Sequence, residues 1–297
     1  MRVRRSLLAW YGAEHRDFPW RHTTEPWAVL LSEVMLQQTQ ASRIAIRFLP
    51  LLERFPSPAA MAAASDAEVL TAWSGLGYNR RALALRRTAA AIAARGWPRD
   101  VFGLERLPGI GPYTARAVAS LAFGEPVGVV DTNVRRWLVR RFGLPVDAPR
   151  SALQALADRL SHGGAPDEIA AWTHATMEFG ARICRPRSPL CEACPIADGC
   201  PSRGTAAVVP VPRQAAFVGS ERAARGALLK HLAASPGRML SVSAARHLAS
   251  ALTPVDFERV VAGLERDGLA HLAEHRLRLG GRAGMADGTA GAATIGP

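Results

Sequence analysis

The sequence predicts an all-α core followed by a small C-terminal module of three helices and a β-hairpin. Two observations predict the core: apolar residues recur at helical spacing from residue 5 to residue 184, and the connections between these stretches are short. A third observation predicts the module, because three further helical patterns precede two short alternating segments.

Core helices are expected over residues 5–12, 27–55, 66–75, 79–95, 132–142, 151–160 and 167–184, with one more after the turn at 107–112. Pro26 opens the 27–55 helix at a position that tolerates proline. Ser65 and Glu68 form a capping box ahead of the next helix. Glu33 stands out because it lies inside an apolar run.

The C-terminal helices are expected over 220–235, 241–252 and 254–268, and the hairpin over 269–280. This order is typical of a winged helix. We therefore divide the chain into a core (1–204), a Pro-containing linker (205–219), a winged-helix-like domain (220–281) and a disordered tail (282–297).

The composition is that of a globular protein with a polyanionic partner. The chain has 297 residues, 48% of them hydrophobic, and a formal net charge of +12. Lys230 is the only lysine, and arginine forks suit phosphate groups. The N-terminus has no apolar signal region, and no run of about 18 apolar residues occurs, so we expect a cytosolic protein without a membrane segment.

The stretch from Leu107 to Arg136 combines a Gly- and Pro-rich turn with a single carboxylate, Asp131. Gly109 and Gly111 are expected to allow positive φ and close approach of the backbone to a partner. N–H groups at a turn that leads into a helix bind phosphate well. The alternative is an ordinary helix start or tight loop.

All four cysteines lie between Cys184 and Cys200, in the pattern Cys-x6-Cys-x2-Cys-x5-Cys. Such a cluster in a reducing compartment indicates metal ligation, and the spacing suits either zinc or a cubane iron–sulfur cluster. Arg185 and Arg187 lie in the loop between the first two ligands. They are either solvated or contacts for phosphate.

These motifs together resemble one family. They are WR at 20–21, SEVMLQQTQ at 32–40, GLGY at 75–78, LPGIGPYTA at 107–115, VDTNVRR at 130–136, and the cysteine spacing of Cys184, Cys191, Cys194 and Cys200. In this order, over about residues 5–202, they resemble the MutY-type adenine glycosylases, helix–hairpin–helix DNA glycosylases related to endonuclease III.

The resemblance implies a six-helix barrel beside an N-terminal and cluster domain, and a 4Fe–4S cluster on the four cysteines. It implies a monofunctional enzyme that removes adenine mispaired with 8-oxoguanine or guanine in double-stranded DNA. We expect a monomer in the bacterial cytosol or nucleoid. The alternatives are a pyrimidine-damage or thymine-mismatch glycosylase of the same fold, and an inert iron–sulfur DNA-binding protein.

Cleavage of an N-glycosidic bond needs a proton for the base and a negative charge for the cationic sugar. By resemblance, Glu33 protonates adenine N7 and later helps to activate water, and its burial would favour the acid form. Asp131 matches the aspartate that stabilises the sugar cation, and Asn133 would position water or a carboxylate. Without the resemblance, Glu33 could be a solvated helix residue, Asp131 a helix N-cap, and Asn133 a first-turn residue.

Tyr113 bears on the class of reaction. Lyase relatives carry a lysine at this point of the hairpin, where its amine forms a Schiff base with the sugar. A tyrosine cannot do this, so the resemblance implies base removal without lysine-dependent strand cleavage. A tyrosine packed at a helix start is the plain structural alternative.

Base removal also needs a wedge and a lined pocket, because the base must leave the duplex. By resemblance, Gln38 and Thr39 probe the gap near the opposite base, while Leu76 and Tyr78 wedge the stack. The pocket would be lined by Trp20, Arg21, Leu36 and His174, of which Trp20 and Leu36 could equally be core residues.

The sequence departs from the family pattern in three places. Asn79 replaces a second tyrosine after GLGY, and His174 stands where relatives carry Glu or Gln, although a buried structural histidine is the more ordinary reading. Residues 220–281 do not resemble the Nudix-like domain that recognises 8-oxoguanine in most members. We hypothesise that this module adds duplex contacts through Arg259, Arg266, Arg276 and Arg278; the alternative is a structural cap with solvated arginines.

Overall fold

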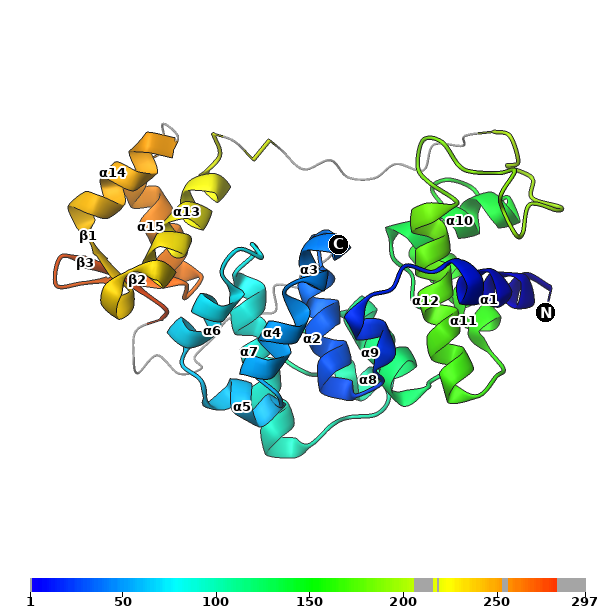
Figure 1. Ribbon diagram of the computed structural model, residues 1–297, viewed down its shortest axis with the longest axis horizontal. Coiled ribbons are helices and arrows are strands. Elements are labelled where there is room, and N and C mark those ends of the chain that lie inside the picture. Colours follow the sequence, from blue (N-terminus) through cyan, green and yellow to red (C-terminus); the bar gives the residue numbers. More distant parts are fainter. Residues whose placement is uncertain (1, 206–215, 218, 253–255, 282–297) are drawn as a thin grey trace. The chain divides into compact units, whose positions relative to one another are not determined.

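The computed structural model describes residues 2–205, 216–217, 219–252 and 256–281 (Figure 1). The predicted tail and most of the predicted linker lie outside these residues. The described residues fall into two compact units, drawn from 1–33, 98–106 and 110–213 in the first and from 34–97, 107–109 and 214–297 in the second. This grouping by contacts differs from the division inferred from sequence, which stays a prediction.

The first unit is helical. It contains α1 (Arg2–Glu14), the 3-10 turn η1 (Pro19–His22), the start of α2 (Pro26–Leu36), α8 (Val101–Glu105), α9 (Pro112–Phe123), α10 (Thr132–Phe142), α11 (Arg150–Ser161) and α12 (Pro166–Arg182). Among the described residues, no helix has both the length and the apolar character needed to cross a membrane.

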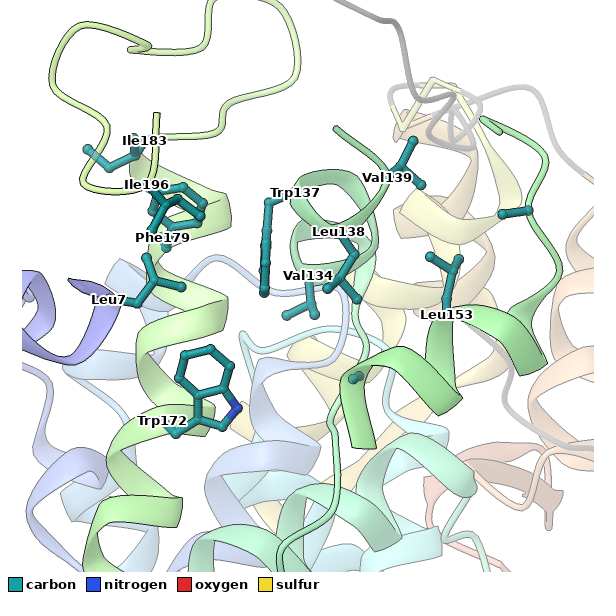
Figure 2. Close-up of a cluster of buried hydrophobic side chains, with 12 residues drawn as sticks. Leu7, Val134, Trp137, Leu138, Val139, Leu153, Trp172, Phe179, Ile183 and Ile196 are labelled. Atoms are coloured by element: carbon teal, nitrogen blue, oxygen red, sulfur yellow. The ribbon is translucent and has the colours of Figure 1, made fainter. Parts of the chain in front are cut away.

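A buried aromatic cluster joins α1, α10 and α12 (Figure 2). Phe179 meets the rings of Trp10 and Trp137 edge to face, each at a centroid distance of 5.9 Å. Ile196, from the cysteine segment, lies in the same cluster, and Cys184 and Cys194 pack against it. Aromatic rings prefer this edge-to-face arrangement to a face-to-face sandwich. Because Ile183 and Ile196 lie in the same cluster, this core holds the cysteine segment at two points.

The second unit contains the remainder of the helical core and the C-terminal part. Its core helices are α3 (Ala41–Ala45), α4 (Phe48–Arg54), α5 (Pro58–Ala63), α6 (Asp66–Trp73) and α7 (Arg80–Arg95). The predicted capping box of Ser65 and Glu68 is present at the start of α6.

The single helix predicted over 27–55 is wrong. The chain instead forms α2, a turn, α3 and α4, and Gln38 in the turn has a φ of +54°. Four consecutive polar residues, 37–40, interrupt the apolar periodicity that would have kept one helix face buried.

The C-terminal part has the order expected of a winged helix. It comprises α13 (Glu221–Ala234), the 3-10 turn η2 (Pro236–Arg238), β1 (Met239–Ser241), α14 (Val242–Leu252), α15 (Phe257–Arg266), β2 (Ala270–Ala273) and β3 (Arg276–Leu279). The strands form an antiparallel sheet in the order β1-β3-β2, in which Leu277 pairs with both Leu240 and Leu272. The predicted fold class is confirmed, and in this part of the chain η2 and β1 were not expected from the sequence pattern.

This C-terminal part is attached to the core helices of its unit. α13 and β3 contact α6, and a Cβ added to Gly280 would lie 3.2 Å from the backbone nitrogen of Ala67. Arg80, at the start of α7, forms an ion pair of 3.7 Å with Asp267. The winged-helix-like part is therefore packed against α6 and α7.

The turn between α8 and α9 depends on one glycine. Gly109 has a φ of +78°, and a Cβ there would lie 2.9 Å from the Ala84 Cβ of α7. Gly111 has a φ of −92° and serves as the N-cap of α9, so the expectation of positive φ was wrong at this position. N-cap residues adopt extended backbone, which needs no glycine.

We predict that Gly109→Ala destabilises the protein by roughly 1–3 kcal/mol, because alanine is strained at this φ and its methyl would press on Ala84. Gly12→Ala is the matched control, since Gly12 lies in α1 with nothing within 4 Å of an added Cβ. We expect the control to be stabilising by about 0.5–1 kcal/mol. Thermal and denaturant midpoints would test this, and equal shifts for both variants would contradict it.

Candidate active site

Glu33 is a buried carboxyl group in the last turn of α2, with 4% of its surface exposed. Burial raises its pKa, a hydrogen bond with Tyr113 lowers it and the negative charge of Asp131 raises it, so that the pKa of Glu33 is about 7. Because the charged form is costly in an apolar site, the protonated acid is well populated near neutral pH.

Tyr113 lies in the first turn of α9, directly after the hairpin turn. Its side chain hydrogen-bonds with Glu33, and its hydroxyl lies 3.9 Å from the Met177 Sδ of α12. Burial and the charges of Glu33 and Asp131 raise the pKa of the phenol well above its usual value. Tyr113 is therefore a neutral hydrogen-bonding group.

Asp131 is the N-cap of α10. Its Oδ1 accepts a hydrogen bond of 2.6 Å from the backbone N–H of Val134, and its Oδ2 accepts one of 2.8 Å from the Asn133 side chain. Burial raises its pKa above the usual value, and these hydrogen bonds and the charge of Arg136 offset part of this rise. The structure thus brings Glu33, Tyr113 and Asp131 together, and gives Asp131 partners that favour a carboxylate.

Arg136 holds the Asn133 side chain that donates to Asp131, and it was not identified as a site residue from the sequence. It is 2% exposed, and its Nη2 donates to Asn133 Oδ1 at 2.8 Å and to the Gly180 carbonyl at 2.6 Å. Its Nε donates to the carbonyl of Cys184 at 2.7 Å. The signal available in the sequence was its position three residues after Asn133 on one helix, where side chains share a face.

Gly180 lets α12 approach α10 closely at this point. A Cβ on Gly180 would lie 2.5 Å from the carbonyl oxygen of Asn133 and 2.9 Å from its Cβ. No ordinary Cβ contact is so short, so the site requires a glycine here for lack of space.

Three of the four predicted pocket residues belong to the first unit. Trp20 is buried and stacks on Phe18 at a centroid distance of 4.7 Å, while His174 stacks on Tyr11 at 6.4 Å. Burial and the charge of Arg21 lower the pKa of His174 to about 3, so the imidazole is neutral. Leu36 is partly buried at the end of α2 and is grouped with the second unit.

Glu178 organises the charged side of this region and was missed in the sequence. It is 1% exposed and accepts hydrogen bonds from Arg16 at 2.7 Å and from Arg21 at 2.8 Å. These arginines hold its pKa at about 2, against the effect of burial. Its position four residues after His174 on α12 was the only available signal.

The residues predicted to probe and wedge the duplex lie on two loops of the second unit. Gln38 is exposed and Thr39 is partly buried in the loop after α2. Tyr78, in the loop before α7, is 37% exposed with a φ of +48°, whereas Leu76 in the same loop is only 2% exposed. In this conformation Tyr78, rather than Leu76, is available at the surface.

The four cysteines line one cavity in the first unit, together with Trp137, Arg140 and Ile196. Arg140 donates to Cys184 Sγ at 3.6 Å and to the Arg185 carbonyl at 2.6 Å, so a cation faces the sulfur atoms. Within the described part of the chain, no three His, Cys, Asp or Glu side chains converge as ligands of one metal ion would. A thiol-lined cavity beside an arginine fits a larger, anionic cluster. Arg185 and Arg187 are exposed on the adjoining loop.

Comparison with known proteins agrees with this geometry. Residues 31–162 match the HhH-GPD superfamily of base excision DNA repair proteins, and residues 184–200 match the iron–sulfur binding domain of endonuclease III. An adenine DNA glycosylase of Mycobacterium tuberculosis is 43% identical over 247 residues, covering 77% of this chain and 78% of the relative. The chain belongs to the MutY-type adenine DNA glycosylase family.

The family assignment makes the chain a DNA glycosylase with an iron–sulfur cluster. The adenine DNA glycosylase of Mycolicibacterium smegmatis is 45% identical over 232 residues, covering 75% of this chain and 78% of the relative. A solved structure of a thermostable thymine-DNA glycosylase is 28% identical, with a TM-score of 0.63, and covers 68% of this chain and 95% of that one. The fold therefore serves glycosylases named for different bases.

We predict that Glu33→Gln stabilises the protein above pH 7. The folded pKa of Glu33 is raised from 4.5 to about 7, so its contribution to stability is fully present below pH 4.5 and is lost as the pH rises through 7. The neutral amide avoids this loss, which corresponds to roughly 3 kcal/mol by the conversion of pKa shift to free energy. Thermal melts at pH 5 and pH 8.5 would show the larger gain at pH 8.5.

The matched control is Glu53→Gln, which changes an exposed glutamate on α4. We expect it to alter the melting midpoint equally at both pH values. A pH-independent effect of Glu33→Gln would contradict the burial argument.

Proposed function

We propose that this glycosylase hydrolyses the N-glycosidic bond of adenine mispaired with 8-oxoguanine or guanine in double-stranded DNA. The observation that carries the proposal is the pairing of a buried acid, Glu33, with an aspartate, Asp131, that is hydrogen-bonded as a carboxylate. These groups supply the proton and the negative charge that departure of a base from a sugar requires.

Each residue of the site has a proposed role. Glu33 donates its proton to N7 of the flipped adenine and afterwards helps to activate water. Asp131 stabilises the positive charge that develops on the sugar, and Asn133 holds that carboxylate through the 2.8 Å hydrogen bond. Tyr113 keeps Glu33 oriented beside the scissile bond.

We propose that Trp20, Arg21 and His174, which all belong to the first unit, line the adenine pocket. The pair with Glu178 fixes the Arg21 guanidinium, and a neutral His174 has one donor and one acceptor for the base edge. The imidazole of His174 thus offers the base one donor and one acceptor, where the resemblance leads us to expect the carboxylate of Glu or the amide of Gln.

The duplex is proposed to contact Gly109 and Gly111 of the hairpin turn and the exposed Arg185 and Arg187. Gln38, Thr39, Leu76 and Tyr78 are proposed to act at the gap left by the base. Insertion of Leu76 would require its loop to open, because the side chain is buried.

The cluster is proposed to be a 4Fe–4S centre on Cys184, Cys191, Cys194 and Cys200. Its iron chemistry is not needed for hydrolysis, and the cavity it would fill lies beside the loop that carries Arg185 and Arg187. We propose that it holds this loop in one conformation.

We propose that the C-terminal part adds contacts to the duplex. Of its four predicted basic residues, Arg259 forms an ion pair with Glu221 and Arg278 with Glu274, at 3.2 Å in the second case. Arg266 and Arg276 are exposed, so they are the stronger candidates for phosphate contacts.

We predict that the protein excises adenine from A:8-oxoG and A:G duplexes in single-turnover assays, and leaves T:G and oxidised-pyrimidine duplexes intact. Glu33→Gln should lower the rate by at least about 100-fold, since it removes the general acid. The wild-type rate should fall as the pH rises through about 7, where Glu33 loses its proton.

Asp131→Asn is the second test, because asparagine caps a helix about as well as aspartate, so a lost rate would reflect the missing charge. Glu53→Gln should retain the wild-type rate. Excision of thymine or an oxidised pyrimidine with no action on adenine would overturn the proposal, as would full activity of Glu33→Gln.

We predict further that the wild-type protein forms no covalent complex with DNA when borohydride is present, because Tyr113 has no amine to make a reducible Schiff base. Tyr113→Lys should introduce a trapped complex and strand cleavage, whereas Tyr113→Phe should not. A trapped complex with the wild-type protein, seen as a shifted band in a denaturing gel, would show that another amine acts and that the enzyme is bifunctional.

A further inference from the structure

Arg81 is a buried cation in the second unit that the catalytic scheme does not use. It lies in the first turn of α7 and is 3% exposed. Burial lowers its pKa to about 10, so it remains protonated at neutral pH. In the described part of the chain no carboxylate forms an ion pair with it, which is unusual because buried charges are normally paired.

Backbone oxygen atoms replace the missing carboxylate. Nη1 lies 2.8 Å from the carbonyl of Val34 and 3.1 Å from that of Met35, in the last turn of α2, and also donates to the Gln37 carbonyl. The last carbonyls of a helix lack partners within the helix and form its negative end, so a guanidinium stabilises them. Arg81 thus caps the helix that carries Glu33.

The same side chain joins two loops. Nη2 donates to Thr39 Oγ1 at 3.1 Å in the loop after α2, and to the Gly77 carbonyl at 3.2 Å in the loop before α7. Its guanidinium also lies over the ring of Tyr78 at 5.2 Å from the centroid. Both loops contain a residue in the left-handed region, Gln38 and Tyr78, so both depend on tertiary contacts to keep their shape.

We propose that Arg81 is a positioning residue that locks the loop of Gln38 and Thr39 to the loop of Gly77 and Tyr78, so that they meet the duplex as one rigid probe. The inference rests on the proposed function, in which these loops act at the gap left by the base. A probe held in one shape cannot adapt to every base pair, so it binds the pair that fits it and disfavours the others, which gives a preference for a mispair over a normal pair.

Only arginine can make this connection. Its planar fork has five N–H donors and reaches acceptors in α2 and in both loops at once, whereas the lysine ammonium is a compact charge with three donors. Arg81→Lys keeps the charge and removes the connection, so it separates the two effects.

The experiment measures binding to two duplexes that differ in one base, A:8-oxoG and A:T, with Glu33→Gln present in every protein so that adenine is not removed. The readout is the ratio of the two Kd values at one salt concentration. We expect Arg81→Lys to reduce this preference at least tenfold while the Kd for the A:T duplex changes less than threefold. Arg87→Lys, an exposed arginine of the same helix, should keep the ratio within twofold.

Thr39→Val provides a milder test, since it removes one acceptor and leaves the guanidinium in place. We expect a smaller loss of preference, and the double variant should lose no more than Arg81→Lys alone, because both changes break the same link. Circular dichroism melts would establish that each variant is folded at the assay temperature.

An unchanged ratio in Arg81→Lys, an equal loss of affinity for both duplexes, or losses that multiply in the double variant would each overturn the inference. Failure of the proposed function would be visible separately. In that case the protein with Glu33→Gln alone would already bind A:8-oxoG and A:T equally, and both ideas would fall.

Discussion

The buried guanidinium of Arg136 is the contact on which the rest of the site depends. It joins the carbonyl of Cys184, at the start of the cysteine segment, to the side chain of Asn133, which in turn holds Asp131. Every acceptor in this series of hydrogen bonds is at least partly buried. Removal of the arginine would therefore leave buried polar groups unpaired and destabilise the folded protein. The conformation at the start of the cysteine segment and the orientation of the Asp131 carboxylate therefore depend on the same arginine.

Burial raises the pKa of both carboxyl groups in this site, but only Asp131 has several partners that offset part of this effect. Glu33 has apolar neighbours and one hydrogen bond with Tyr113, and its pKa is about 7. Asp131 is also buried, but a backbone N–H, an amide and a nearby guanidinium compensate its charge. Such a division is how a fold obtains an acid and an anion from similar side chains. It also explains why one sits inside an apolar helix and the other at a helix start.

The sequence was sufficient for features carried by local pattern. The periodicity predicted most helices and the order of the C-terminal part, the spacing of Ser65 and Glu68 predicted the capping box, and the motifs identified the family. Features that depend on contacts between distant residues could not be read in this way. The break of the 27–55 helix, the extended backbone of Gly111, and the burial of Leu76, Glu178 and Arg136 follow from packing that no window of sequence contains. The roles of the individual site residues remain proposals.

Gly180 shows how far the site extends beyond the groups that face DNA. Its missing side chain is what allows α12 to lie against the backbone of Asn133, and its carbonyl receives Arg136. Any side chain there would push on the residue that steadies Asp131. A natural variant with any other residue at position 180 would accordingly be inactive, although glycine has no side chain that could take part in the reaction. Activity would then depend on the absence of a Cβ atom at residue 180 as much as on the groups that are present.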